Sequence, residues 1–185
     1  MTNADSRERP SDQSTSPAVV IDTARLRIRH MTVAEDTAFV LELLNDPGFL
    51  QYIGDKRVRT DEDARRYIEN GPRASYARFG FGLYTVVLKA SGESTGICGL
   101  VKRESMNDVD VGYAFLPRFR GAGYAIEAAS AVVRHGLDVL HLPRIVALTD
   151  PANARSIRLL EKLGLSSRGP IVLTGETRET LLFGS

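Results

Sequence analysis

The chain has 185 residues, and its 24 lysines and arginines nearly balance its 23 aspartates and glutamates, which leaves a formal net charge of +1. Its length accommodates one well-buried α/β domain and is short for two, and 43% hydrophobic with 25% charged residues is the composition of an ordinary globular protein. The near-neutral charge provides no electrostatic argument for binding nucleic acid or a membrane surface, and no apolar run reaches the ~18 residues that a bilayer-spanning helix needs.

Residues 1–17 are rich in Ser, Asp, Arg and Pro and have almost no apolar side chains to bury, so we expect a disordered tail there. We expect residues 18–185 to form a single domain. The N-terminus lacks the apolar core of a signal peptide, which favours a cytoplasmic protein. The single cysteine, Cys98, excludes an internal disulfide framework and a cysteine cluster for a metal, and its apolar neighbours predict a small buried side chain.

The first half of this domain is predicted to combine strands with two main helices. A capping box formed by Thr32 and Glu35 opens the first helix, and Thr60 caps the second, whose acidic first turn suits the helix dipole. Two β-rich runs separated by a glycine-containing turn predict a hairpin. In chain order these elements are a strand at residues 26–31, a helix from Thr32 to Leu44, a short helical turn at 49–53, a helix at 61–76, and strands at 81–89 and 94–103.

The second half begins with a strand, a glycine-rich turn and a long helix. Residues 109–115 alternate with the period of a strand. Residues 124–140 carry small apolar side chains at three- and four-residue steps, which allows a helix to approach a sheet closely. The remaining predicted elements are a strand at 145–149, a helix at 154–163 that Gly164 stops, and strands at 170–173 and 178–183.

The turn between the strand at 109–115 and the long helix has the composition of an anion-binding loop. Glycines at 121 and 123 remove side chains where backbone N–H groups would point at an anion, and the helix adds its free first-turn N–H groups and the positive end of its dipole. We assign pyrophosphate binding to the backbone of residues 118–125, with the Arg120 side chain as an extra contact. A P-loop motif and the third glycine of a dinucleotide-binding fingerprint are both missing. An ordinary tight strand-to-helix turn is the structural alternative.

The ordered series from residue 109 to residue 165 closely resembles the GNAT superfamily of acyl-CoA-dependent N-acetyltransferases. Arg118-Phe119-Arg120-Gly121-Ala122-Gly123 matches the family signature R/Q-x-x-G-x-G/A. The run from Asp150 to Ser156, followed by Leu160-Glu161-Lys162-Leu163-Gly164, resembles the RimJ/RimL-like branch, which acetylates protein N-termini and various small amines. The resemblance covers residues 24–183.

This resemblance implies a fold, a cofactor and partners. The expected fold class is α/β (α+β), with a mixed, mostly antiparallel central sheet of about seven strands flanked by about four helices. The expected cofactor is acetyl-CoA, with CoA as a product and no metal. The expected acceptor is a small-molecule amine or a protein N-terminus, and the protein is expected to be a monomer or a homodimer.

The resemblance also implies which residues contact the cofactor. In the family, the strand before the loop splays from its neighbour and exposes backbone N–H groups to the pantetheine arm and the acetyl carbonyl. Many relatives carry Lys or Arg where Ala122 stands, so the loop backbone is expected to contribute more here. A main-chain contact by Phe115 is compatible with a core position of its ring. The expected cofactor-binding residues are Ala114, Phe115, Leu116, Arg118, Phe119, Arg120, Gly121, Ala122, Gly123, Tyr124, Ala125, Asn153 and Ser156.

Two of these residues lie at the start of the helix at 154–163. Asn153 matches the family asparagine that hydrogen-bonds the pantetheine arm, although Asn before a helix is also a good N-cap. Many relatives place a tyrosine at the position of Leu160, where it protonates the leaving thiolate. RimL-like members use a serine at the position of Ser156 instead, and a hydroxyl can donate a hydrogen bond to sulfur. A solvated helix serine is the structural alternative.

Asp110 is the candidate general base, because several family members carry a glutamate in this strand and burial in a cleft would raise its pKa. A solvated edge carboxylate explains it as well, and a water chain or an amine that arrives neutral would need no such base. Tyr113 and Glu127 recur in the resembling motif, and we interpret them mainly as packing and helix-start residues.

Two functions from different classes follow. The first is an enzyme, an acetyl-CoA-dependent N-acetyltransferase in which the amine attacks directly in a ternary complex. The second is a non-catalytic acyl-CoA-binding or sensing module, which the absence of a tyrosine at Leu160 favours. The first two helices and the final hairpin, which shape the acceptor site in the family, contain no residues that identify the acceptor.

Overall fold

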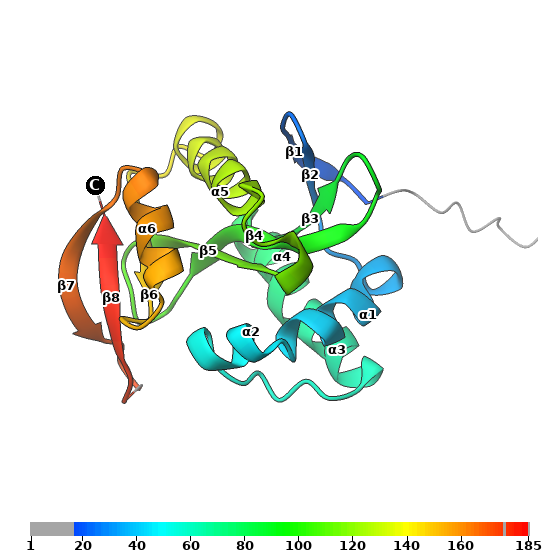
Figure 1. Cartoon of the computed structure of the whole chain (residues 1–185), viewed down its shortest axis with the longest axis horizontal. Coiled ribbons are helices and arrows are strands. Elements are labelled where there is room, and N and C mark those ends of the chain that lie inside the picture. Colours follow the sequence, from blue (N-terminus) through cyan, green and yellow to red (C-terminus); the bar gives the residue numbers. More distant parts are fainter. Residues whose placement is uncertain (1–16, 176, 185) are drawn as a thin grey trace, which may run out of the picture.

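A computed structural model of the chain describes residues 17–175 and 177–184, and in this part eight strands form one sheet in the order β1-β2-β3-β4-β5-β6-β8-β7 (Figure 1). The strands are β1 (Val19–Asp22), β2 (Leu26–Arg29), β3 (Leu83–Leu88), β4 (Ser94–Lys102), β5 (Val109–Phe115), β6 (Ile145–Thr149), β7 (Ser166–Val172) and β8 (Glu179–Gly184). The α-helices are α1 (Val33–Leu44), α2 (Pro47–Tyr52), α3 (Asp61–Ile68), α4 (Ala74–Phe79), α5 (Tyr124–Arg134) and α6 (Ala154–Lys162). The expected mixed α/β architecture with a mostly antiparallel sheet is confirmed, although the strands and helices outnumber the prediction.

The sheet opens between β5 and β6, which run parallel. Their pairing covers only Val109 with Ile145 and Asp110 with Val146. From Ala147 onward, β6 pairs with β8 instead. Beyond Asp110, no strand of the described residues pairs with this edge of β5, whose other edge remains paired with β4. Residues 111–115 therefore present main-chain groups that lack a strand partner on one side.

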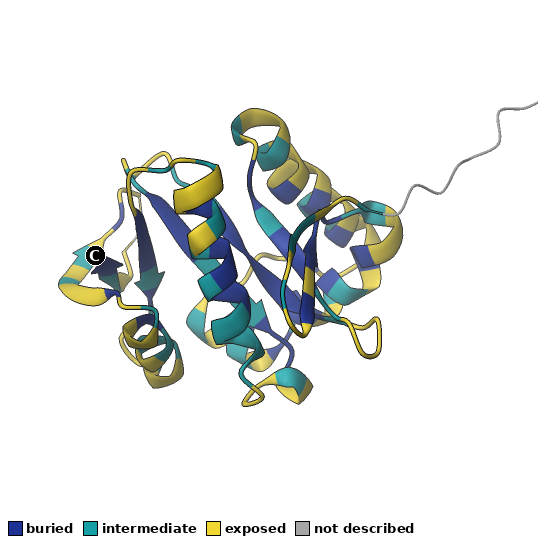
Figure 2. Cartoon of the chain, turned by 90° about the horizontal axis from the view of Figure 1, so that it is seen from above, coloured by how far each residue is buried: buried dark blue, intermediate teal, exposed yellow. Residues whose placement is uncertain are grey.

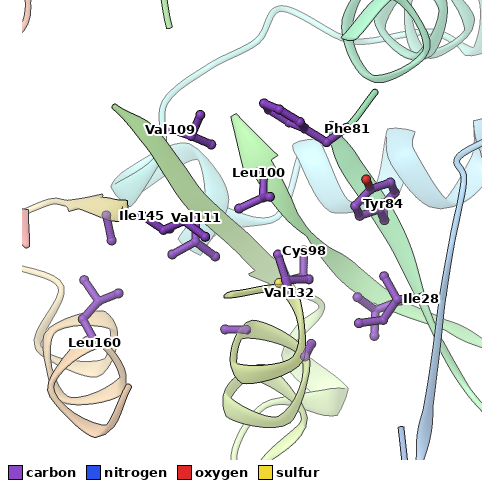
Figure 3. Packing of buried hydrophobic residues seen from close by; sticks show 14 of the residues in the cluster. Ile28, Phe81, Tyr84, Cys98, Leu100, Val109, Val111, Val132, Ile145 and Leu160 are labelled. Carbon is purple, nitrogen blue, oxygen red and sulfur yellow. The ribbon is translucent and has the colours of Figure 1, made fainter. Parts of the chain in front are cut away.

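Helices cover both faces of the sheet, and each face has its own apolar cluster. On one face, Val132 of α5 and Leu160 of α6 belong to the same cluster as Val111 of β5 (Figure 3). On the other face, Leu43 of α1 belongs to a cluster with Ile97 of β4. Figure 2 shows buried residues along the strands and on the sides of the helices that face them, with exposed residues on the outside.

Helix α5 lies close to the sheet, as its small residues predict. Ala128 and Ala129 have no exposed surface. Past the end of α5, a Cβ built on Gly136 would lie 2.5 Å from Ile145 Cδ1, so only a glycine fits there without displacing its neighbour. The segment that follows α5 therefore packs tightly against β6.

The two long predicted helices are both interrupted by π-helical turns. The helix expected at residues 61–76 is α-helical as α3, passes through a π turn at Glu69–Arg73, and continues as α4. Pro72 lies inside that turn. Because proline has no N–H to donate within an α-helix, the wider turn accommodates it. The helix expected at 124–140 likewise ends in a π turn, at His135–Val139.

Two edge strands differ from the prediction. β1 was not expected, because the apolar run Val19-Val20-Ile21 does not alternate with polar residues, although β1 pairs with β2 in a local hairpin. β7 begins at Ser166, earlier than the predicted residue 170, and its register shifts between Ser167 and Gly169. Such irregularities and the following Pro170 are tolerated in an edge strand. The predicted tail lies outside the described residues except for Pro17.

A buried ion pair joins β2 to the start of α1. Arg29 Nη1 lies 2.8 Å from Asp36 Oδ2, and Arg29 Nη2 lies 2.9 Å from Asp36 Oδ1.

Thr32 N also donates to Asp36 Oδ2 at 2.7 Å, while Thr32 Oγ1 accepts from Glu35 N at 3.3 Å. The predicted capping box is therefore only half correct, since Asp36 supplies the reciprocal acceptor in place of Glu35. A complete capping box is found at Thr60 and Asp63 instead.

We predict that Asp36→Asn lowers the free energy of unfolding by about 3 kcal/mol, the lower end of the cost of breaking a buried pair. The variant keeps the shape of the side chain but leaves the buried Arg29 guanidinium with only the half-exposed Glu35, 3.1 Å away, as a carboxylate partner. Urea unfolding at neutral pH measures the change. Asp55→Asn is the matched control, because Asp55 pairs with Arg59 on the surface, and no resolvable change is expected there. Equal effects in the two variants would contradict the buried pair's role.

Candidate functional site

The loop between β5 and α5 has the backbone geometry of an anion-binding turn. A 3₁₀ turn at Pro117–Phe119 opens it, and Gly121 and Gly123 have φ angles of 84° and 83°. Gly123 is the N-cap of α5 and has no side chain to cap the helix. The N–H groups of the first turn therefore remain free to donate to a ligand. A Cβ built on Gly121 meets no protein atom within 4 Å. The glycine there serves the left-handed backbone and the open space in front of it, which suits a bound phosphate.

Both arginines of the loop are tied to carboxylates of the first helices. Arg118 contacts Glu42 of α1, with Nη2 at 3.2 Å from Oε2. Arg120 contacts Asp46, the N-cap of α2, and its Nε donates to Phe115 O at 2.8 Å. Their side chains would have to leave these carboxylates to reach a phosphate, so the loop backbone is the part already available to an anion.

Arg25, which the sequence analysis did not select, holds the loop from the other side. Arg25 Nη1 donates to Ala122 O at 2.9 Å, and Arg25 Nε lies 2.7 Å from Glu127 Oε2. Its guanidinium also lies over the ring of Tyr124, with the carbon Cζ 4.7 Å from the ring centroid. A contact between residues about a hundred positions apart has no local sequence signal, and the glutamate in the first turn of α5 was the only hint of a cationic partner.

Glu127 stays ionised in this arrangement. Burial opposes its ionisation, but hydrogen bonds from Thr23 Oγ1 at 2.6 Å and from the main chain and side chain of Arg25 outweigh burial and lower the pKa of Glu127. The negative charge at the start of α5 is thereby paired with a cation, so it does not leave an unbalanced carboxylate beside the anion-binding loop.

The residues predicted to contact the cofactor through their main chain lie at the end of β5. Ala114 is half-buried and contacts the cluster under α1, and the Phe115 ring is buried in the core on the opposite face, as its packing interpretation required. Leu116 N donates to Thr95 O at 3.0 Å, so this N–H is already used. Main-chain contacts at this end of β5 stay a prediction, and Leu116 would make one only by giving up a bond to the protein.

A chain of hydrogen bonds connects the start of α6 to β5. Asn153 Oδ1 accepts from Ser156 N at 3.1 Å, which is the N-cap that the sequence offered as the alternative role. That cap leaves the amide nitrogen Nδ2 able to donate elsewhere. Ser156 Oγ lies 2.9 Å from the hydroxyl of Tyr113. Leu160, where many relatives have a tyrosine, is fully buried in the core.

Tyr113 was interpreted as a packing residue, and the structure adds a polar contact at its hydroxyl. Burial raises the pKa of Tyr113 to about 12, and the hydrogen bond with Ser156 partly opposes that rise. The phenol is therefore protonated at neutral pH. Its position on β5 is visible in the alternation of the strand, but its partner on α6 depends on how the helix lies over the sheet.

Asp110 lies away from this group. Its side chain is 2% exposed, with Arg103 Nε 2.8 Å from Oδ1 and Arg103 Nη2 3.3 Å from Oδ2. Burial raises the pKa of Asp110, and Arg103 opposes the rise. Because side chains alternate along a strand, Asp110 and Tyr113 point to opposite faces of β5. The structure thus does not bring Asp110 and Ser156 together, and the role of Asp110 as a base stays a prediction.

Cys98 and two histidines with shifted pKa values lie away from Ser156 and the loop. Cys98 is fully buried, and burial raises the pKa of its thiol, which confirms the prediction of a small buried side chain. Burial lowers the pKa of His30 and of His135. Over residues 17–175 and 177–184, no group of three or more His, Cys, Asp or Glu side chains is placed to hold a metal ion. No helix within the same residues is long and apolar enough to cross a membrane.

Comparisons with known proteins agree with this geometry. A model of the acetyltransferase (GNAT) domain matches residues 25–166. In Bacillus subtilis (strain 168), the protein YkkB is 32% identical over 145 residues, 77% of this chain and 83% of that protein, and the N-acetyltransferase YnaD is 30% identical over 149 residues, 80% and 84%. The spermidine N(1)-acetyltransferase of Escherichia coli (strain K12) is 28% identical over 87 residues, 46% of this chain and 47% of that protein.

Solved structures share the fold. The GNAT-family acetyltransferase of Bacillus anthracis aligns with a TM-score of 0.72 at 27% identity, over 89% of this chain and 96% of that one. RimL, a ribosomal L7/L12 alpha-N-protein acetyltransferase in complex with coenzyme A, aligns with a TM-score of 0.67 at 16% identity, over 91% and 97%. The domain match and the relatives agree with the divergent strands and the glycine loop at the start of α5. The chain belongs to the GNAT family of acetyltransferases.

Proposed function

We propose that this protein is an acetyl-CoA-dependent N-acetyltransferase of the RimJ/RimL-like branch that acetylates a primary amine by direct attack in a ternary complex. The observation that carries the proposal is the arrangement around the opening between β5 and β6. In this proposal the loop at residues 118–125, the unpaired edge of β5 and the Asn153 end of α6 all border this opening. The loop, the strand edge and the helix end together suit a ligand with an anionic end and a long hydrogen-bonding arm.

Each part of this site has a separate task. The backbone of residues 118–125 would hold the phosphates at the positive end of α5. Asn153 Nδ2 and the free edge of β5 would hold the arm, and the hydroxyl of Ser156 would donate to the sulfur as negative charge develops there. Acetyl-CoA supplies the thioester that the amine attacks. Asp110 could serve as a base only after its carboxylate gives up the bonds to Arg103.

A non-catalytic acyl-CoA-binding module is the second candidate, and the burial of Leu160 is the observation that favours it. Leucine has no acidic hydrogen, and the Leu160 side chain packs into the core, so residue 160 cannot protonate a leaving thiolate. Thiol release from acetyl-CoA in the presence of an amine panel separates the candidates. Turnover with any amine supports the enzyme, whereas tight acetyl-CoA binding without thiol release for the whole panel supports the module.

The acceptor is proposed from the chemistry of the family and from the segments that meet beside α2. Arg178 in the β7–β8 hairpin donates to Gln51 O at 2.9 Å and pairs with Asp150 in the loop before α6. These three segments border the acceptor side in our proposal. The relatives act by their names on spermidine and on a ribosomal protein N-terminus, so the panel should contain polyamines, N-terminal peptides and aminoglycosides.

We predict that Gly121→Ala weakens acetyl-CoA binding by about tenfold or more. The new Cβ would occupy the open space in front of the loop, and a φ of 84° strains a residue with a Cβ by ~1–2 kcal/mol. Isothermal titration calorimetry with acetyl-CoA measures the affinity. Gly92→Ala is the matched control, since Gly92 in the β3–β4 turn has a φ of 75° and also meets no atom within 4 Å. An unchanged affinity in folded Gly121→Ala, or the same loss in both variants, would refute the assignment of the loop.

We predict opposite kinetic effects at the two ends of the α6 cap. Ser156→Ala should lower kcat by roughly ten- to a thousand-fold, the range between one ordinary hydrogen bond and one strong oxyanion-type donor, with little change in KM for acetyl-CoA. Asn153→Ala should raise KM for acetyl-CoA and lower the melting temperature through the lost cap, with a smaller effect on kcat. Steady-state kinetics with one competent acceptor measure both. A wild-type kcat in Ser156→Ala would leave the serine as part of the helix surface.

A further inference from the structure

The hydroxyl of Tyr113 on β5 forms its hydrogen bonds with one residue of α6, Ser156. It lies 2.9 Å from Ser156 Oγ and 3.5 Å from Ser156 O, and in the described part of the chain these are its hydrogen bonds. We propose that Tyr113 is a positioning residue that donates its phenolic hydrogen to Ser156 Oγ and thereby directs the serine's own hydrogen toward the sulfur of the departing thiolate. This inference rests on the proposed acetyltransferase function.

The chemistry of the two hydroxyls sets the direction of the hydrogen bond. A phenol has a pKa of ~10 in water and is a stronger donor than an aliphatic alcohol, whose oxygen is the better acceptor. Burial keeps the phenol of Tyr113 protonated, so its hydrogen is available. The 3.5 Å contact with Ser156 O is at the limit of a hydrogen bond, which leaves Ser156 Oγ as the effective acceptor.

Once Ser156 Oγ accepts from Tyr113, its own hydrogen is the remaining donor. A hydroxyl that accepts one hydrogen bond donates a stronger one, because chained hydrogen bonds polarise each other. The backbone N–H of Ser156 is held by Asn153 Oδ1, so the serine is fixed on both sides: by the helix cap and by the phenol. A fixed donor aimed at developing charge costs little reorganisation during the reaction.

The position of Tyr113 connects this contact to the reaction. Tyr113 lies in the part of β5 that has β4 on one edge and no described strand on the other. The tyrosine that many relatives carry on the helix is replaced here by the buried Leu160. A phenol is therefore still present beside the start of α6, but it comes from the strand and acts through the serine.

The reaction balances without any further reactant. The amine nitrogen bonds to the acetyl carbon, and the carbon–sulfur bond breaks with its electron pair remaining on sulfur. The proton that the nitrogen loses passes to the solvent. Ser156 donates a hydrogen bond to the sulfur, and Tyr113 keeps its proton throughout, since it orients the serine and does not transfer a proton itself.

A double-mutant cycle tests the proposal, with kcat and KM measured by thiol release from acetyl-CoA and a competent amine. Tyr113→Phe should lower kcat by about three- to tenfold, the value of one ordinary hydrogen bond, and leave KM for acetyl-CoA unchanged. Ser156→Ala should lower kcat further. Tyr113→Phe combined with Ser156→Ala should be no slower than Ser156→Ala alone, because the phenol then has no serine to orient.

Tyr84→Phe is the matched control for the loss of a buried phenol. Tyr84 is 1% exposed and lies on β3, in the same row as Tyr113, with Cys98 of β4 between them in the register. Its removal should leave kcat unchanged. Melting temperatures of all four variants show whether any loss of kcat comes from unfolding.

The outcomes separate this inference from the proposed function. A wild-type kcat in Tyr113→Phe, or losses that multiply in the double variant, would overturn the role of Tyr113 and leave the acetyltransferase function in place. A wild-type kcat in Ser156→Ala would overturn the role of both hydroxyls. A wild-type protein that binds acetyl-CoA and turns over no amine would overturn the proposed function, and this inference with it.

Discussion

The early divergence of β5 from β6 is the constraint on which the rest of the site depends. Two residue pairs hold these parallel strands together, after which β6 turns to β8 and one edge of β5 is left without a strand. Unpaired main-chain groups are costly when buried away from water, so a fold keeps such an edge open where a ligand or solvent can satisfy it. The divergence also leaves room for α6 to bring its N-terminus beside β5.

The loop at the end of β5 depends on polar contacts with distant segments. Gly121 has open space in front of it, whereas a Cβ built on Gly123 would lie 3.3 Å from Arg25 Nη2, and neither glycine has a side chain that could pack. Arg25 holds it from the β1–β2 turn, while Arg118 and Arg120 connect it to α1 and α2. The loop can therefore keep its donors exposed without losing its shape, because charge-assisted hydrogen bonds replace the apolar contacts that glycine cannot make. These contacts also join the loop to α1 and to the start of α2.

The start of α6 combines an apolar core position with two hydroxyl groups. The buried Leu160 strengthens the core between α6 and the sheet, and a polar side chain at that position would have to be buried as well. The hydroxyls near the opening are instead those of Ser156 and Tyr113, which come from a helix and a strand. A side chain on a strand is held more rigidly than one on a loop, which favours precise orientation of its partner.

The sequence by itself determined the features that depend on local chemistry. Alternation identified β5, the glycines at 121 and 123 identified a tight strand-to-helix turn, and Asn153 followed by a helical pattern offered a cap. All are short-range effects of backbone sterics and hydrogen bonding. Only the tertiary structure decided that β6 leaves β5 after Asp110, that Arg25 reaches Ala122, and that Tyr113 meets Ser156. These contacts join residues far apart in the chain, and their geometry follows from how the helices pack on the sheet, which no local pattern encodes.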